Sequence, residues 1–161
     1  MAGEGSISFT NELLARDEVI QKIESGDFLV IAGDEKQIKD LPSGNWMAGS
    51  IPYFMTDEGG TVDQDKLYVN TLSGINSNRM PRITTYDEKS ISRIAKEAPD
   101  HGFTIVILPA GSKVHTLYAQ DAPEFENMFF SPIIGWIAGT HLNELGSNSA
   151  KTGFGLSLIH I

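Results

Sequence analysis

Cysteine is absent from this chain of 161 residues. That absence excludes disulfide bonds, thiol nucleophiles and zinc sites built on thiolate ligands. Long apolar runs are absent too, because no stretch approaches the roughly 20 apolar residues that a bilayer-spanning helix needs. Residues 1–10 also lack the basic start and apolar core of a signal peptide. Together these absences predict a cytoplasmic protein with no membrane partner.

Basic residues are scarce. The sequence has 12 Lys and Arg against 21 Asp and Glu, which gives a formal net charge of -9. A nucleic-acid-binding protein needs a basic face to neutralise phosphates, and no cluster of Lys and Arg is present. We therefore predict no nucleic-acid partner, and we interpret the negative charge as favouring solubility.

Three sequence motifs of well-known sites are also missing. Neither phosphate-binding pattern, Gly-x-Gly-x-x-Gly or Gly-x-x-x-x-Gly-Lys-Ser/Thr, occurs in the chain. The Gly-x-Ser-x-Gly motif of serine hydrolases is absent as well. We therefore predict no cofactor and no metal, and the sequence assigns no catalytic residue.

What is present is an ordinary globular composition, with 40% hydrophobic and 20% charged residues. Amphipathic helical patterns alternate with apolar runs of strand length. The expected helices are 17–24 (capped by Asp17), a short polar helix after Asp34 through Leu41, 87–98 (capped by Asp87) and 112–120. The expected strands are 28–31, 46–55, 66–72, 83–86, 103–108 and 132–138. The pattern predicts an α/β fold: a mixed, mainly parallel sheet with helices packed on it, and one antiparallel hairpin within residues 46–72.

Two stretches of the chain resemble each other in order and kind. Residues 19–50 and 90–140 each run through a helix, a buried strand, an Ala-Gly-polar turn, a second helix and a Trp-x-Ala-Gly-hydroxyl segment. This suggests two α-β-α-β repeats, each with a βαβ unit. Gene duplication and shared local geometry without common origin both explain the likeness.

Candidate site residues follow from these repeats. In parallel sheets ligands bind outside the carboxyl ends of strands, which places Asp34 and Ser112 at candidate positions, although both also suit plain helix caps. His115 lies one turn beyond Ser112, and this pair allows a nucleophile and base. The aromatic residues Trp46, Tyr53 and Trp136 suit either a pocket wall or the core.

The segments 41–55 and 132–139, which contain Trp-Met-Ala-Gly-Ser and Trp-Ile-Ala-Gly, resemble a bacterial domain family of unknown function. A weaker similarity is to FIST-type sensory domains, through the order of strands and Gly-rich turns. The first resemblance implies no activity, and the second implies a ligand-binding role in signalling.

The last six residues, 156–161, read Leu-Ser-Leu-Ile-His-Ile and resemble the translation of a transposase adapter used in sequencing libraries. We therefore expect residues 1–155 to form a single α/β domain that lacks its own C-terminal part, followed by a non-native tail. An apolar strand at 132–138 without its natural partner would promote self-association.

From the sequence we expect a small-molecule-binding or sensory module of unknown ligand. The alternative is a hydrolase-like enzyme that uses Ser112 and His115, and a structural or interaction role also stays open.

Overall fold

The computed structural model describes residues 8–74 and 81–155, which form a mixed α/β fold. In chain order the elements are β1 (Ser8–Ala15), α1 (Arg16–Glu24), β2 (Phe28–Gly33), α2 (Glu35–Ile38), β3 (Trp46–Ser50), β4 (Tyr53–Thr56), β5 (Gly59–Val62), β6 (Lys66–Ser73), η1 (Ile91–Arg93), β7 (Thr104–Pro109), α3 (Lys113–Asp121), η2 (Ala122–Glu124), β8 (Ile133–Ala138), η3 (Leu142–Glu144) and β9 (Thr152–Phe154).

The main sheet has five strands in the order β1-β6-β2-β3-β9. Only β2 and β3 run parallel, while β1–β6, β6–β2 and β3–β9 are antiparallel. β7 and β8 form a separate parallel pair. The expected mixed sheet is therefore confirmed, but the expectation that it is mainly parallel is wrong. The apolar pattern indicates that a strand is buried, and it does not say on which side of a neighbour the strand lies or in which direction it runs.

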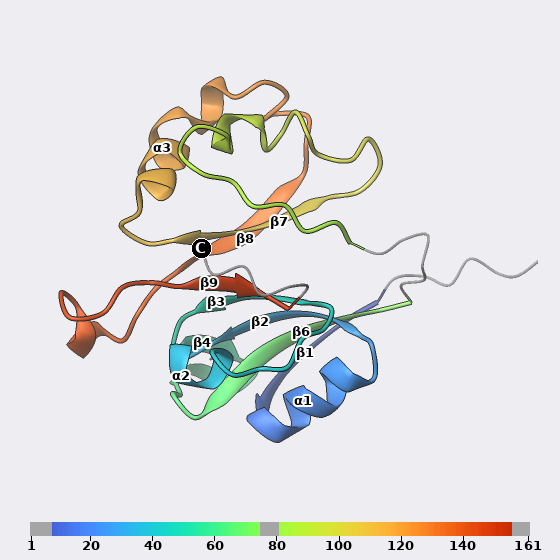
Figure 1. Ribbon diagram of the computed structural model, residues 1–161, viewed down its shortest axis with the longest axis vertical. Coiled ribbons are helices and arrows are strands. Elements are labelled where there is room, and N and C mark those ends of the chain that lie inside the picture. Colours follow the sequence, from blue (N-terminus) through green and yellow to red (C-terminus); the bar gives the residue numbers. More distant parts are fainter. Residues whose placement is uncertain (1–7, 75–80, 156–161) are drawn as a thin grey trace, which may run out of the picture.

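The elements stack in four layers (Figure 1). Helix α1 covers one face of the five-stranded sheet, where Val19 and Ile23 pack against Leu29 and Ile31. The parallel pair β7–β8 covers the other face, through Ile105, Ile107 and Trp136 among others. The far side of this pair is covered in turn by α3 and η1. Because β2 lies between two apolar layers, all six of its residues are buried, as its continuous apolar run predicts.

Two βαβ units lie within this stack, as expected. The first is β2-α2-β3 and the second is β7-α3-β8, and each joins two parallel strands through a helix. Each helix begins at a predicted cap: Asp34 accepts a hydrogen bond from the backbone N–H of Lys36, and Ser112 accepts one from that of His115. Descent of the two units from one ancestral repeat stays a prediction.

The antiparallel hairpin expected over residues 46–72, with strand 46–55 paired to strand 66–72, does not form. A shorter antiparallel hairpin lies inside this region and consists of β4 and β5, whose register pairs Thr56 with Gly59. The expected strand 46–55 is broken between β3 and β4, where Pro52 has no N–H to give to a sheet. Strand β6 lies on the other side of β2 from β3 and pairs with β1 and β2.

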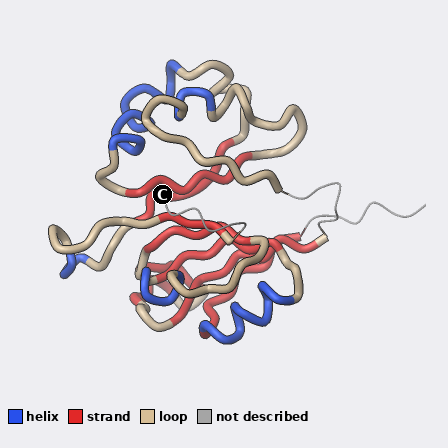
Figure 2. The backbone as a smooth tube through the Cα atoms, in the orientation of Figure 1, coloured by secondary structure: helices blue, strands red, loops and turns tan. Residues whose placement is uncertain are grey.

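Residues 81–103 contain less regular structure than expected, as Figure 2 shows. The strand expected at 83–86 does not form, and the helix expected at 87–98 is a series of turns around the 3-10 helix η1. The side chains of Asp87 and Ser90 explain this, since Ser90 Oγ donates to Asp87 Oδ1 and accepts from the Asp87 N–H. Such local bonds compete with α-helical pairing. The inner face is nonetheless as predicted, with Ile91, Ile94 and Ala95 buried.

Helix α1 begins slightly earlier than expected and is not capped by Asp17. Its N-cap is Ala15, whose N–H donates to the Glu18 carboxylate at 2.9 Å. The carboxylates of Asp17 and Glu18 lie in the first turn, where the helix dipole favours negative charge. The predicted non-native tail, 156–161, lies outside the described residues.

Candidate functional site

The carboxyl ends of the two parallel strand pairs meet at one junction. Ser50 ends β3, and its backbone oxygen accepts a hydrogen bond from the Gly139 N–H at 2.6 Å, just beyond β8. The Ser50 hydroxyl donates to the Gly139 carbonyl and accepts from the Lys151 N–H, both at 2.8 Å. The last residues of the two Trp-x-Ala-Gly-hydroxyl segments are thus brought side by side.

Close packing beneath the junction depends on a glycine. A Cβ on Gly49 would lie 2.5 Å from Ile107 Cγ2 and 3.1 Å from Trp136 Nε1. Only a residue without a side chain lets β3 approach the β7–β8 layer this closely. The Ala-Gly pair in the first segment therefore serves the packing of one βαβ unit on the other.

A small polar cleft opens at this junction. Its lining residues come from the ends of β2, β3 and β8 and from the segment around η3: Asp34, Glu35, Ser50, Ile51, Pro52, Gly139, Thr140, His141, Glu144 and Asn148. The free volume is about 10 Å³, close to the room for one water molecule. Three carboxylates and one imidazole make the lining acidic and rich in hydrogen-bonding groups.

Of the residues proposed from the sequence, Asp34 and Tyr53 belong to this region. Asp34 Oδ1 caps α2, and Oδ2 accepts from the Gln64 side chain at 3.0 Å. The Tyr53 ring stacks on His141 with centroids 5.7 Å apart, and its hydroxyl accepts from the Leu142 N–H at 3.0 Å. Tyr53 thus holds the segment that forms one wall of the cleft.

The two tryptophans take different positions. Trp46 is buried on the α1 side of the main sheet, and its Nε1 donates to the Pro42 carbonyl at 2.8 Å. Trp136 lies between the two sheets, and its buried Nε1 has no hydrogen-bond partner within the described part of the chain. Both side chains therefore contribute to packing, and neither lines the cleft.

Ser112 and His115 lie next to each other without forming a nucleophile–base pair. The Ser112 hydroxyl donates to the Pro109 carbonyl at 2.7 Å and accepts from the His115 backbone N–H. His115 Nδ1 accepts from the Gly111 N–H at 3.3 Å. A serine is activated when its hydroxyl donates to an imidazole, and here both partners are engaged with backbone groups instead.

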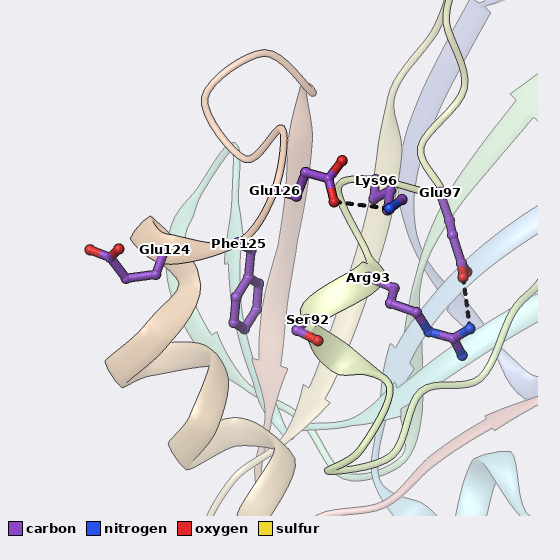
Figure 3. Close-up of a pocket in the computed structure, with 7 residues that line it drawn as sticks. All are labelled: Ser92, Arg93, Lys96, Glu97, Glu124, Phe125 and Glu126. Carbon is purple, nitrogen blue, oxygen red and sulfur yellow. Dashed lines mark hydrogen bonds and ion pairs between the residues drawn. The ribbon is translucent and has the colours of Figure 1, made fainter.

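A second, larger hollow lies between η1 with the turns that follow it and η2 with the residues that follow it, and Figure 3 shows its lining. This groove has a volume of about 520 Å³ and is lined by Ser92, Arg93, Lys96, Glu97, Glu124, Phe125 and Glu126. Four of its five charged side chains are already paired, Arg93 with Glu97 at 3.3 Å and Lys96 with Glu126 at 3.0 Å. Glu124 points away from the other six (Figure 3).

The sequence offered no direct signal for the groove. Its residues 92–97 come from turns that were expected to form a continuous helix, and residues 124–126 lie in a segment for which no element was expected. The cleft residues Thr140, His141, Glu144 and Asn148 were also missed. The sequence did contain one sign of the cleft: a hydroxyl residue follows each Trp-x-Ala-Gly segment, and these two residues, Ser50 and Thr140, both line it.

Neither a metal centre nor a membrane span is found in the described ranges. No three His, Asp or Glu side chains of residues 8–74 and 81–155 are arranged to hold an ion. None of the helices there combines the length and the apolar character that crossing a bilayer demands.

A family model described as a family of unknown function (DUF6976) matches residues 14–159. The chain belongs to this family. The resemblance to an uncharacterised domain family, carried by the two Trp-x-Ala-Gly segments, is thereby confirmed. Comparison with curated proteins and with solved structures gives no match. The cleft and the groove are the two candidate sites in the described part of this DUF6976 chain.

Proposed function

We propose that this DUF6976 domain is a small-molecule-binding module of the sensory kind, and that its ligand binds at the cleft beside Ser50 and Gly139. The observation that carries the proposal is the convergence of the carboxyl ends of β2, β3 and β8 on one polar cleft. In α/β folds this is the end of the sheet at which ligands bind.

The cleft accepts a ligand only if its outer wall moves. Its free volume of about 10 Å³ is far below the roughly 300–1,000 Å³ of a typical small-molecule site. The wall around η3 is the mobile candidate, because its contacts are few: the Tyr53 hydroxyl bond and the stacking on His141 hold it, while Leu142 and Leu145 are exposed. Movement of this wall on binding would supply the conformational signal that a sensory module needs.

The alternative function, a hydrolase that uses Ser112 and His115, gains no support from the geometry. The Ser112 hydroxyl donates to a backbone carbonyl, and the imidazole Nδ1 accepts from a backbone N–H. The larger groove also competes poorly as a site, since its four paired charges would have to exchange their partners for the ligand.

The test is a thermal-shift screen of the full chain against polar small molecules: amines, amino acids, dicarboxylates, sugars and nucleosides. Hits are then measured by calorimetry on two variants that change the cleft with little change in shape: Thr140→Val removes a hydroxyl, and Asp34→Asn replaces a charged acceptor oxygen by a neutral N–H donor. We expect these variants to weaken binding about 10-fold or more, since one lost hydrogen bond to a ligand costs about 1.5 kcal/mol.

Matched controls lie outside the cleft. Lys96→Gln alters the groove, while Ser112→Ala and His115→Ala alter the start of α3, and all three should leave affinity within about twofold. Loss of binding in Lys96→Gln with normal binding in Thr140→Val would move the site to the groove and refute the proposal. Ester or amide hydrolysis that disappears in Ser112→Ala would instead establish the enzyme.

A further inference from the structure

Strand β8 forms an edge that lacks the usual protection of edge strands. β7 and β8 form a two-stranded sheet, so among the described residues no strand pairs with the outer side of β8. The carbonyls of Pro132 and Ala138 accept from β7 and the residue after it. Since the bonding direction alternates along a strand, the backbone groups of Ile133, Gly135 and Ile137 point away from β7.

The side chains on this edge are apolar and exposed. Ile134 is 56% exposed and Ile137 is 47% exposed, and Phe129 and Phe130, just before the strand, are more than 80% exposed. Parallel strands are normally covered on both faces, so exposure of this degree is unusual for β8.

The two edge strands of the main sheet differ from β8 in the way that natural sheets protect their edges. β1, at one edge of the main sheet, carries Glu12, which forms an ion pair with Lys22 at 3.0 Å. β9, at the other edge, is only three residues long. Charge and shortness are the common defences against edge pairing, and β8 has neither.

The distribution of charge favours a second copy of the chain as the partner of this edge. Residues 127–140 contain no charged side chain, although the chain as a whole has a formal net charge of -9. Two copies of such an acidic chain repel each other over most of their surface, and the neutral β8 edge lets them touch without opposing like charges. A basic partner would find no carboxylate on this edge to pair with.

We propose that two copies of the chain associate through antiparallel pairing of their β8 edges, which gives a continuous four-stranded sheet β7-β8-β8-β7 across a two-fold axis. The outward backbone groups of Ile133, Gly135 and Ile137 fix the register, with Gly135 opposite its copy. In this register Ile133 of one chain faces Ile137 of the other, so the apolar side chains cover each other. This interface is closed by its symmetry, and it leaves the cleft at Ser50 outside the pairing.

The first test is the mass of the full chain in solution, measured by light scattering after size exclusion from about 1 to 100 μM. We expect a dimer, and Ile137→Lys should shift it to monomer by placing a charge against Ile133 of the other chain on each side of the axis, where it has no partner. Met55→Lys is the matched control, because Met55 is an apolar residue exposed on a different strand. Ile159→Lys tests whether the C-terminal segment causes the association instead, and it should leave the dimer intact.

The second test does not depend on a destabilising substitution, and it uses the absence of cysteine. Ile133→Cys and Ile137→Cys are made as separate single variants, each with one thiol in the chain. Opposed positions in an antiparallel pair lie within the distance that a disulfide spans. On oxidation, a mixture of the two variants should give a cross-linked dimer on a non-reducing gel, whereas each variant alone should give little.

A monomer at all concentrations would overturn the proposal, and so would polydisperse aggregates or a dimer that survives Ile137→Lys. Equal cross-linking of each variant with itself would refute the register. None of these outcomes bears on ligand binding at the cleft, so the two proposals can fail independently.

Discussion

Substitution of Ser50 by alanine is expected to destabilise the fold more than a hydroxyl deletion usually does. Ser50 is only 4% exposed, and its hydroxyl serves two backbone groups from distant parts of the chain, the Gly139 carbonyl and the Lys151 N–H. Alanine would leave both without this partner. A buried polar group that loses its hydrogen bond costs about 1–3 kcal/mol.

Both bonds are only partly buried, so water reaches part of the gap. We therefore expect Ser50→Ala to lower the free energy of unfolding by about 2–4 kcal/mol, a large share of the roughly 5–15 kcal/mol of a typical domain. For a chain of this size that corresponds to a fall in Tm of roughly 4–16 °C.

The assay is urea unfolding of the full chain followed by tryptophan fluorescence. Trp46 reports from the α1 side of the main sheet and Trp136 from the space between the sheets, so the signal covers two layers. Ser147→Ala is the matched control, because its exposed hydroxyl donates to the Glu144 carbonyl, and its loss should cost less than about 0.5 kcal/mol. A Ser50→Ala cost below about 1 kcal/mol, indistinguishable from this control, would show that the two hydroxyl bonds contribute little to holding the junction together.

Two further predictions concern the backbone and pH. Gly135→Ala should lower the free energy of unfolding in urea by about 2–4 kcal/mol, because Gly135 has a φ of +154° and a Cβ there would collide with the Val106 carbonyl. Gly60→Ala is the control and should change it little, because a Cβ on Gly60 meets no atom within 4 Å, and equal losses in the two variants would refute the reasoning. Burial, together with the hydrogen bond to Glu97, raises the pKa of Tyr86 above its ordinary 10.0, so its stabilising effect is complete below about pH 10 and is lost as pH rises through the raised value. Between pH 8 and 11.5 the Tm should therefore fall less steeply with pH for Tyr86→Phe than for the native chain, and parallel curves of Tm against pH would contradict this.

The parts of the fold that could be predicted from the sequence are those whose signal is local. The apolar run of β2 and the hydroxyl cap at Ser112 each determine their own conformation, and both were predicted. β1 was not, because its residues are mostly exposed and show no strict alternation of polar and apolar side chains, and it is held as a strand by its pairing with β6. β9 has only three residues, too few for a periodic pattern.

The candidate site was harder to predict for the same reason. Asp34 could be placed at a strand end from its neighbours in sequence. His141 and Glu144 reach the cleft only because β8 ends beside β3, a contact between residues 89 positions apart. The repeated Trp-x-Ala-Gly-hydroxyl segment hinted at that contact, but one sequence does not show that two similar segments touch.

The Ser50 junction also has a consequence for the order of folding. The Ser50 hydroxyl accepts its bond from Lys151, 101 residues later, and the open side of β3 is closed only by β9. As the chain is synthesised, the first βαβ unit is therefore complete long before the strand that covers its edge has left the ribosome. Contacts so distant in sequence close slowly, so β3 remains open to a competing strand during that interval. The chain is thus most vulnerable to mispairing before its last described strand is made, and fast capture of β9 by β3 would decide its yield.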